Sequence, residues 1–320
     1  MIALTAGDPC GIGAEIIVKT ISDLPLAIRK RLMVICDQAL ILDVAKKAGG
    51  NLEGVQFDDR GQLTAADVTL GQPSLAGGHA QVAYLERAAH LANRGAIAAI
   101  VTAPINKACA RRAGFQFPGH TEFFSERLTA KRVGMLFVGP TLRIILATIH
   151  HPISHVTKQI TEESVRTAIE LGSGAMRQYF GIKTPIIGVL ALNPHAGEEG
   201  LLGSEEIEII TPAIAKARES TLANIIGPLV PDAAYRTQLR GHSPDLFVAM
   251  YHDQALIPIK LIDFEKTVNV TVGLPVIRTS PDHGTAYDIA GNGVARHQSF
   301  AAALNLAIDM LDQKERDTQP

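Results

Sequence analysis

Cysteines and charged residues are both scarce in this chain of 320 residues. The three cysteines, Cys10, Cys36 and Cys109, lie far apart, and no Cys-x-x-Cys pair occurs. Because three cysteines cannot all pair within one chain, we expect neither a disulfide scaffold nor a thiolate zinc site, and a reducing compartment fits this pattern. Charged residues make up 19% of the chain and hydrophobic residues 47%. This balance argues against disorder and for sizeable buried cores.

No charge of one sign dominates the sequence. Lysine and arginine together number 30, and aspartate and glutamate 32, which gives a net charge of −2. A nearly neutral chain has no electrostatic reason to bind nucleic acid. Any anion that it binds must therefore be held by a local cluster of cations.

Signals for secretion and for membrane insertion are missing as well. The first eight residues contain neither the basic segment nor the long apolar run of a signal peptide. The most apolar stretches, such as residues 142–149, are far shorter than the roughly 20 residues that span a bilayer. We expect a cytoplasmic protein without a membrane partner.

Short apolar runs alternate with amphipathic stretches, and the length suggests about two domains. Strands are predicted at residues 2–6, 32–36, 97–102, 134–138, 143–148, 185–190, 245–251 and 268–272. Apolar spacings of three and four predict helices at residues 78–93 and 299–311, and further helices are predicted to start at Thr161 and Ser204. This alternation predicts an α/β fold with a mostly parallel sheet, in which ligands collect beyond the carboxyl ends of the strands.

The first loop after a strand lacks the dinucleotide fingerprint. Residues 7–13 read Gly-Asp-Pro-Cys-Gly-Ile-Gly, which is not the Gly-x-Gly-x-x-Gly spacing of a Rossmann turn. The loop is either a tight strand–helix turn or a ligand site at the start of the next helix. The residues alone leave both interpretations open.

Several histidines stand where a parallel sheet gathers its ligands. His150, His195 and His252 follow predicted strands, and His120 stands at a predicted helix start. Because loops at one edge of a parallel sheet converge, three imidazoles there are a plausible ligand set for a divalent ion such as zinc, with one position open for substrate. No short motif supports the pair His151 and His155, which we interpret as facing solvent.

Two cations in apolar surroundings form another group. They are Lys260 and Arg278, and Asn269 lies between them in a predicted strand. A buried cation needs an anion, and phosphate suits an arginine fork combined with the point charge of a lysine. From their spacing alone, residues 282–291 are only a polar loop and a short helix that precede the last long helix.

Six segments together carry a family resemblance. They are residues 5–13, 102–107 (Thr-Ala-Pro-Ile-Asn-Lys), 118–122, 193–198 (Asn-Pro-His-Ala-Gly-Glu), 249–254 (Ala-Met-Tyr-His-Asp-Gln) and 273–284. In this order, and over essentially the whole chain, the sequence resembles the 4-hydroxythreonine-4-phosphate dehydrogenase family of vitamin B6 biosynthesis. Residues 283–291 also resemble the cofactor loop of the wider isocitrate and isopropylmalate dehydrogenase superfamily, which binds NAD without a Rossmann turn.

The resemblance implies two α/β domains around a cleft. Residues 1–117 and 284–320 would form a terminal domain with the cofactor loop, and residues 118–283 a central domain for metal, substrate and dimerisation. It also implies one divalent ion (zinc, magnesium or cobalt) at a homodimer interface, held by His150, His195 and His252 from both subunits. Because adjacent residues at a strand end point to opposite faces, we expect His150 and not His151 to reach the ion.

The resemblance also assigns the other site residues. It implies substrate contacts at His120, Thr121, Lys260, Asn269 and Arg278. It places the cofactor, NAD in preference to NADP, on His283, Gly284, Thr285 and Asp288. Together with the three metal ligands, Lys260 completes the expected catalytic set.

The implied reaction is a metal-dependent oxidation of 4-phosphooxy-L-threonine by NAD. The product, 2-amino-3-oxo-4-phosphooxybutanoate, would lose carbon dioxide to give 3-amino-2-oxopropyl phosphate for pyridoxal phosphate biosynthesis. The metal would lower the pKa of the substrate hydroxyl and polarise the new carbonyl. Cys10, Ala14, His151 and Ala255 depart from the usual family pattern, and none of them is an implied ligand.

Three other functions compete with this one. A paralogue acting on 4-phospho-D-threonate or D-erythronate would keep the same metal and phosphate residues, so the motifs do not separate the two substrates. A metallohydrolase acting on phosphate esters has no need of the loop at residues 283–291. A metal-binding module without catalytic activity leaves the clustering of cations and histidines at loop ends unexplained.

Overall fold

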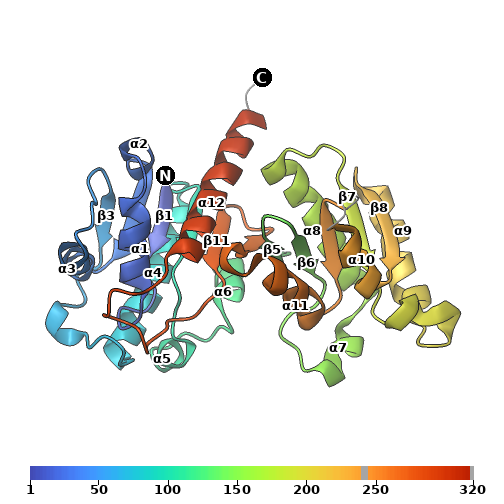
Figure 1. Cartoon of the computed structure of the whole chain (residues 1–320), viewed down its shortest axis with the longest axis horizontal. Helices are drawn as coiled ribbons and strands as arrows, with labels where there is room; N and C mark the ends of the chain where they lie inside the picture. Colours follow the sequence, from blue (N-terminus) through green and yellow to red (C-terminus); the bar gives the residue numbers. More distant parts are fainter. Residues whose placement is uncertain (239–243, 318–320) are drawn as a thin grey trace. The chain divides into compact units, whose positions relative to one another are not determined.

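The computed structural model describes residues 1–238 and 244–317, which form two compact units (Figure 1). Unit 1 comprises Met1–Lys131 and Leu274–Leu311, and unit 2 comprises Arg132–Gly273 and the residues from Asp312 onward. Each unit is therefore built from two separate segments of the chain. The division into functional domains at residues 117/118 and 283/284 stays a prediction.

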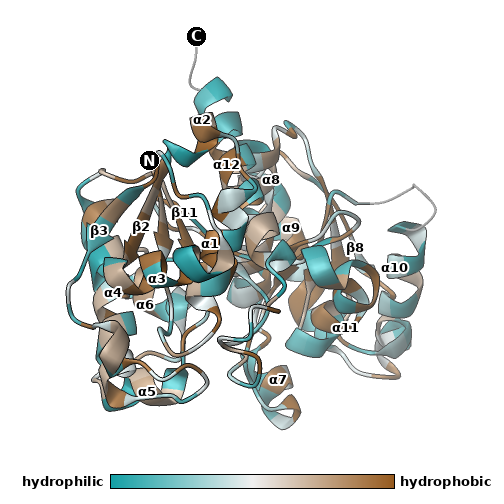
Figure 2. Ribbon diagram, turned by 60° about the vertical axis from the view of Figure 1, so that its left-hand side comes forward, coloured by the Kyte–Doolittle hydropathy of each residue, from teal (hydrophilic) through white to brown (hydrophobic). Residues whose placement is uncertain are grey.

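Unit 1 is a layered α/β unit whose strands are all parallel. The strand order is β3 (Gln56–Asp59), β2 (Leu32–Cys36), β1 (Ile2–Thr5), β4 (Ala99–Thr102), β11 (Ile277–Pro281). The helices are α1 (Gly13–Ser22), α2 (Leu26–Arg29), α3 (Gln38–Ala48), η1 (Ala65–Asp67), α4 (Leu75–Asn93), α5 (Lys107–Arg112), α6 (His120–Arg127) and α12 (Gln298–Asp317), which leaves the unit after Leu311. Every residue of β1 and β4 is buried, as expected for parallel strands covered by helices on both faces. The apolar colour of β2 in Figure 2 reflects the same burial.

Unit 2 mixes parallel and antiparallel strands. The order is β10 (Val268–Val272), β5 (Gly134–Val138), β6 (Arg143–Leu146), β9 (Leu246–Ala249), β7 (Ile186–Leu190), β8 (Asn224–Leu229). Strand β5 runs antiparallel to β10 and β6, and the other pairs are parallel. The helices are α7 (Ile153–Gln159), α8 (Glu162–Phe180), η2 (Pro194–Gly200), η3 (Glu206–Ile210), α9 (Thr211–Ser220), α10 (Pro231–Gln238), α11 (His252–Asp263) and η4 (Phe264–Lys266).

The alternation of side chains along β6 explains how helices cover both faces of the unit 2 strands. Ile144 and Leu146 belong to a buried cluster that includes Ala255 and Ile259 of α11. The intervening Ile145 points to the other face, where it lies close to Gly172 of α8. A strand with both faces buried is apolar throughout, and this is why the sequence pattern identifies β6.

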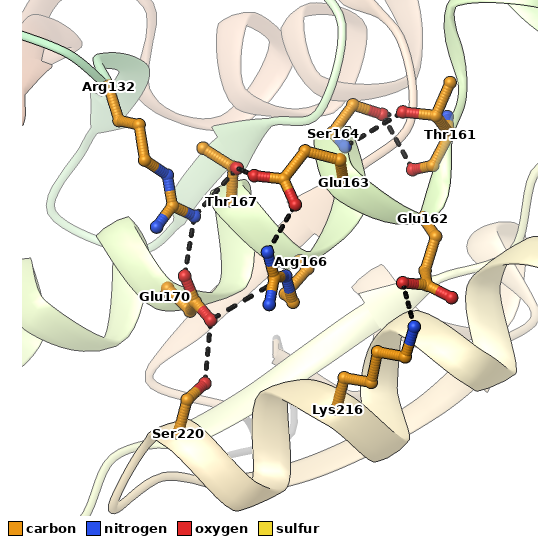
Figure 3. Close-up of polar contacts among 10 residues, drawn as sticks. All are labelled: Arg132, Thr161, Glu162, Glu163, Ser164, Arg166, Thr167, Glu170, Lys216 and Ser220. Carbon is orange, nitrogen blue, oxygen red and sulfur yellow. Dashed lines mark hydrogen bonds and ion pairs between the residues drawn. The ribbon is translucent and has the colours of Figure 1, made fainter.

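Helix α8 is also held by polar contacts on its exposed side (Figure 3). Its N-terminus is capped by Thr161, whose hydroxyl accepts from the Ser164 N–H at 3.1 Å. Further along, Glu170 pairs with Arg132 at 2.6 Å and accepts from Ser220 at 2.7 Å, which joins α8 to the end of α9. Such exposed pairs contribute little individually, so packing of the apolar face dominates the stability of this helix.

The structure confirms the predicted α/β class and all eight predicted strands. It adds three strands that the sequence pattern missed, β3, β8 and β11. Strand β3 reads Gln-Phe-Asp-Asp, β8 contains Gly-Pro, and β11 contains the buried polar residues Arg278, Thr279 and Ser280. None of them shows the apolar run on which strand prediction depends. Within the described residues, no helix is long and apolar enough to cross a membrane.

Candidate active site

Arg278 is the most deeply buried of the predicted substrate residues. It lies on β11 with a side chain that is 3% exposed, and its Nη2 donates to Thr102 Oγ1 at the end of β4, at 2.6 Å. Burial lowers the pKa of Arg278 to about 9, and the nearby Glu122 carboxylate counteracts part of this shift. A guanidinium in such a place is suited to bind an anion, because the anion would relieve the cost of burying the charge.

His120 begins α6 close to Arg278. Burial, followed by the positive charges of Arg278 and Lys107, holds the pKa of His120 well below its ordinary value of 6.5. Its Nε2 is enclosed and has no hydrogen-bond partner in the part of the chain that the structure describes. A neutral imidazole with an unsatisfied buried nitrogen is suited to a hydrogen bond with a ligand. The next residue, Thr121, is also buried.

Lys107 is a candidate that the sequence analysis did not single out. It is the first residue of α5, and its charge acts on His120. A Cβ atom added to Gly119 would lie 3.9 Å from Lys107 Nζ, so this ammonium group approaches the backbone just before His120. The Thr-Ala-Pro-Ile-Asn-Lys segment, residues 102–107, is one of the six that carry the family resemblance. Only the tertiary structure, however, places Lys107 beside His120, one of the predicted substrate residues.

In unit 2 the structure brings His150 and His252 together. Their ring centroids are 5.6 Å apart, and both line a pocket of about 260 Å³ with His151, Ile153, Val156, Tyr251 and Asp253. The reason is the pairing of β6 with β9, which aligns Leu146 with Ala249. His150 follows β6 and His252 follows β9, so both leave the same edge of the sheet.

Hydrogen bonds orient the start of α11, where His252 lies. His252 Nδ1 is 2.7 Å from Asp253 Oδ1. Gln254 is buried and donates from Nε2 to Ala191 O at 2.8 Å, beyond the end of the neighbouring strand β7. The Met250 N–H donates to the other end of the same amide, Oε1, at 2.7 Å. The polar residues of the Tyr-His-Asp-Gln segment thus fix where His252 emerges.

His151 lines the same pocket as His150, contrary to the expectation from strand alternation. Strand β6 ends at Leu146, four residues before His150, so the two histidines lie in irregular backbone. The alternation of strand side chains therefore does not apply to them. His155 lies on α7 and is exposed, and the pocket is lined without it.

His195 lies in an unusual turn after β7. Its side chain is 72% exposed, and its Nδ1 is 3.2 Å from Glu198 Oε2. The five residues 195–199 all have positive φ, and only one of them is glycine. A left-handed conformation costs roughly 1–2 kcal/mol for each residue that has a Cβ, so the surrounding structure must enforce it.

Glu206 anchors this left-handed turn. It is 3% exposed, and its Oε1 accepts from the Leu192 and Asn193 backbone N–H groups, each at 2.8 Å. Its Oε2 accepts from Asn193 Nδ2 at 3.0 Å. Burial raises the pKa of Glu206, but these donors outweigh that effect and hold the pKa below its ordinary value. The sequence suggested only a helix start at Ser204 and gave no sign of this role.

The pocket lined by His150 and His252 supplies only part of the ligand set that a divalent ion needs. Two imidazoles that share one pocket suit zinc or a similar ion. Among the described residues, however, no three histidine, cysteine or carboxylate side chains are close enough to hold one. The ligand set formed by a single chain is thus two imidazoles, and His195 is not part of the pocket lining.

Lys260 and Asn269 are the substrate candidates of unit 2. Lys260 lies in the last turn of α11 and is half-buried. Asn269 lies on β10 opposite Phe137 of β5, and its Oδ1 is buried without a hydrogen-bond partner among the described residues. A buried amide oxygen in this state is suited to accept a hydrogen bond from a ligand.

The predicted cofactor loop contacts the first loop of unit 1. Thr285 O accepts from the Ile12 N–H at 3.1 Å, and His283 Nδ1 is 3.0 Å from Gly284 O. His283 Nε2 is buried without a partner in the described chain, and Asp288 is exposed. Loop 7–13 therefore makes its turn against residues 283–288.

Comparisons with known proteins identify the family to which this chain belongs. The family model for the pyridoxal phosphate biosynthetic protein PdxA matches residues 27–307. The 4-hydroxythreonine-4-phosphate dehydrogenase of Desulfosudis oleivorans is 41% identical, over 97% of this chain and 95% of that protein. The crystal structure of the protein of the same name from Klebsiella pneumoniae superposes with a TM-score of 0.86 at 34% identity, covering 97% of this chain and 99% of the other.

A more distant likeness concerns the fold alone. An isocitrate dehydrogenase from Methylococcus capsulatus has a TM-score of 0.50 at 15% identity, over 98% of this chain and 86% of the other. This likeness agrees with the predicted fold class, an α/β fold with a mostly parallel sheet. The chain is an enzyme and belongs to the family of the pyridoxal phosphate biosynthetic protein PdxA, the 4-hydroxythreonine-4-phosphate dehydrogenases.

Proposed function

We propose that this enzyme oxidises 4-phosphooxy-L-threonine with NAD as the acceptor and one divalent ion at each site. The product is 2-amino-3-oxo-4-phosphooxybutanoate, which loses carbon dioxide to give 3-amino-2-oxopropyl phosphate. The observation that carries the proposal is the buried Arg278 beside the neutral His120, in a chain 41% identical to a protein named for this substrate. We place the reaction in the cytoplasm.

Arg278 and His120 are proposed to bind one anionic end of the substrate. The guanidinium supplies charge and a planar fork of N–H donors, and Thr102 holds one side of it. Because His120 is neutral, its enclosed Nε2 either donates or accepts a hydrogen bond without adding charge. The resemblance assigns further substrate contacts to Thr121, and to Lys260 and Asn269 of unit 2.

His150 and His252 are proposed to hold the divalent ion, with His195 as the third ligand. When bound, the ion supplies Lewis acidity at the substrate hydroxyl and NAD accepts the hydride. The contact of His252 Nδ1 with Asp253 keeps a proton on that nitrogen and leaves the Nε2 lone pair for a ligand bond. His283, Gly284, Thr285 and Asp288 are proposed to bind the dinucleotide.

A second copy of the chain is proposed to complete the metal site. Helix α11, which begins at His252, exposes Ile257 and Leu261, at 59% and 81%, and Phe264 follows it at 69%. These spacings of four and three residues form one apolar stripe, which a symmetric partner would cover. Because His150 and His252 already share a pocket within one chain, His195 is the ligand that we assign to the partner.

Hybrid dimers test this arrangement. A His195→Ala chain keeps His150 and His252, and a His252→Ala chain keeps His195, so a mixed dimer contains one complete site. Mixing these two inactive variants should restore up to half of the wild-type activity in each mixed dimer. Mixing His150→Ala with His252→Ala should restore none, because both residues come from the same chain. The reverse pattern would contradict the assignment.

Substrate assays test the reaction itself. Purified protein with added Zn²⁺, Mg²⁺ or Co²⁺ should reduce NAD, more readily than NADP, when given 4-phosphooxy-L-threonine, with release of carbon dioxide. The same assay with 4-phospho-D-threonate and 4-phospho-D-erythronate tests the paralogous activity. A higher kcat/KM for either of these compounds would replace the proposed substrate and leave the metal and cofactor assignments standing.

A further inference from the structure

A tyrosine in the predicted cofactor loop is bound to two other loops of unit 1. The Tyr287 hydroxyl donates to Asp8 Oδ2 at 2.7 Å and accepts from Asn106 Nδ2 at 2.7 Å. Asp8 belongs to the first loop, residues 7–13, and is 1% exposed. Asn106 immediately precedes α5. One hydroxyl group therefore joins three segments that are far apart in the sequence.

The direction of each hydrogen bond in this network is fixed. Asn106 Oδ1 accepts from the Cys109 N–H at 2.9 Å as the N-cap of α5, so its amide nitrogen must face the tyrosine. Asp8 Oδ1 accepts from the Cys10 N–H at 2.8 Å, which leaves Oδ2 for Tyr287. Burial and the hydrogen bond to Asp8 raise the pKa of Tyr287, so its hydroxyl keeps the proton that it donates.

The backbone of residues 285 and 287 also packs closely against Gly11 and Gly71. A Cβ atom on Gly11 would lie 2.8 Å from Thr285 O, and one on Gly71 would lie 2.9 Å from Tyr287 O. The Gly71 N–H donates to Cys10 O at 2.8 Å. These glycines let the first loop and residue 71 pack directly against the backbone of the cofactor loop.

Ala286 lies between Thr285 and Tyr287 and has a φ of +44°. An alanine in the left-handed region is strained and remains there only if its neighbours are held. Thr285 is held by Ile12 and Tyr287 by Asp8 and Asn106. The loop is thus kept in one defined conformation by contacts outside it.

We propose that Tyr287 is a positioning residue that organises residues 283–288 in advance for the dinucleotide. The inference rests on the proposed role of this loop in binding the cofactor. A loop that is already ordered loses less conformational freedom when its ligand binds, and this raises affinity without any new contact. Removal of the hydroxyl should therefore weaken cofactor binding and leave the chemistry and the binding of the phosphorylated substrate unchanged.

The test is the removal of one oxygen atom. Tyr287→Phe is compared with Tyr179→Phe, since Tyr179 is buried in unit 2 and its hydroxyl makes no hydrogen bond within the described residues. NADH affinity is measured by fluorescence titration, and steady-state kinetics are measured with each substrate varied in turn. For Tyr287→Phe we expect the Kd for NADH and the KM for NAD to rise about tenfold, the equivalent of one charge-assisted hydrogen bond. The kcat and the KM of the phosphorylated substrate should stay within twofold, and Tyr179→Phe should match the wild type.

The outcomes separate this inference from the proposed function. If the wild-type protein binds NADH and Tyr287→Phe binds it equally well, Tyr287 has no positioning role and the proposed function stands. If both KM values change together, the hydroxyl acts on the fold in general and the inference is wrong. If the wild-type protein does not bind NADH at all, the cofactor assignment itself fails.

Discussion

Replacement of Arg278 by lysine keeps a basic residue but removes the guanidinium fork. The bond from Arg278 Nη2 to Thr102 Oγ1, at 2.6 Å, holds the plane of the guanidinium in one orientation. An ammonium group has neither this anchor nor the planar pair of donors. The buried position makes the exchange more damaging, because it already lowers the pKa of the arginine from 12.5 to about 9. A lysine with an ordinary pKa of about 10.4 would be driven toward its neutral form at the same place.

The expected magnitude corresponds to one hydrogen bond between the guanidinium and the anion. One charge-assisted hydrogen bond to phosphate or carboxylate is worth about 1.5–3 kcal/mol, so kcat/KM for the phosphorylated substrate should fall about 10- to 150-fold. The Kd for NADH should stay within twofold, because the guanidinium is assigned to the substrate and residues 283–288 to the cofactor. The residual activity of Arg278→Lys should rise, relative to the wild type, as the pH is lowered and the lysine becomes protonated.

The assay varies each ligand in turn at several pH values. Arg111→Lys on α5 is the matched control, since that arginine is exposed, and it should behave as the wild type. If Arg278→Lys weakened NAD and left the phosphorylated substrate untouched, the assignment of the two binding regions would be reversed. An unchanged kcat/KM would show that Arg278 does not bind the substrate.

Three further predictions address the histidines and the turn of unit 2. His150→Ala should lose bound metal, measured by elemental analysis, and nearly all turnover, while His155→Ala keeps both; full metal retention in the first variant would refute the ligand assignment. Glu206→Gln should raise the metal Kd about tenfold, because it loosens the left-handed turn, whereas the exposed Glu208→Gln should leave it unchanged. His120 is neutral when folded and binds a proton more readily when unfolded, so this residue should reduce stability as the pH falls through 6.5. His120→Asn should flatten that loss in urea unfolding between pH 7 and 5, and an identical slope in both proteins would contradict the neutral imidazole.

The sequence correctly predicted the elements in which burial alone determines where apolar residues stand. Strands such as β1 and β4 are apolar because helices cover both faces, and the amphipathic spacing of α4 and α12 has the same cause. Strand β11 was missed because three of its buried residues, Arg278, Thr279 and Ser280, are polar. Arg278 and Thr279 are accommodated by hydrogen bonds to Thr102 and to Ala303 O. Hydropathy along the chain contains no information about such partners.

The residues of the candidate site likewise fall into two groups, those that the sequence identified and those that only the structure revealed. Position after a strand was sufficient to single out His150 and His252, since the pairing of β6 with β9 sends both loops to one edge. Strand alternation predicted that His150 and His151 point to opposite faces, but both line the same pocket. The rule does not apply because β6 ends four residues before His150. Lys107 lies in a segment of the family resemblance, residues 102–107, but only the fold places it beside His120. No pattern marked Glu206 as the residue that binds the backbone before the turn of His195.

By itself the sequence determined the α/β class, the order of most strands and helices, and the family. Each of these follows from patterns and motifs among residues that are neighbours along the chain. Only the tertiary structure decided which side chains meet. It brought Tyr287 to Asp8 across 279 positions and Arg278 to Thr102 across 176. It also forced residues 195–199 into a left-handed turn that no local preference favours. Contacts of this kind depend on how strands pair and helices pack, and those energies are set by the whole fold rather than by any one segment.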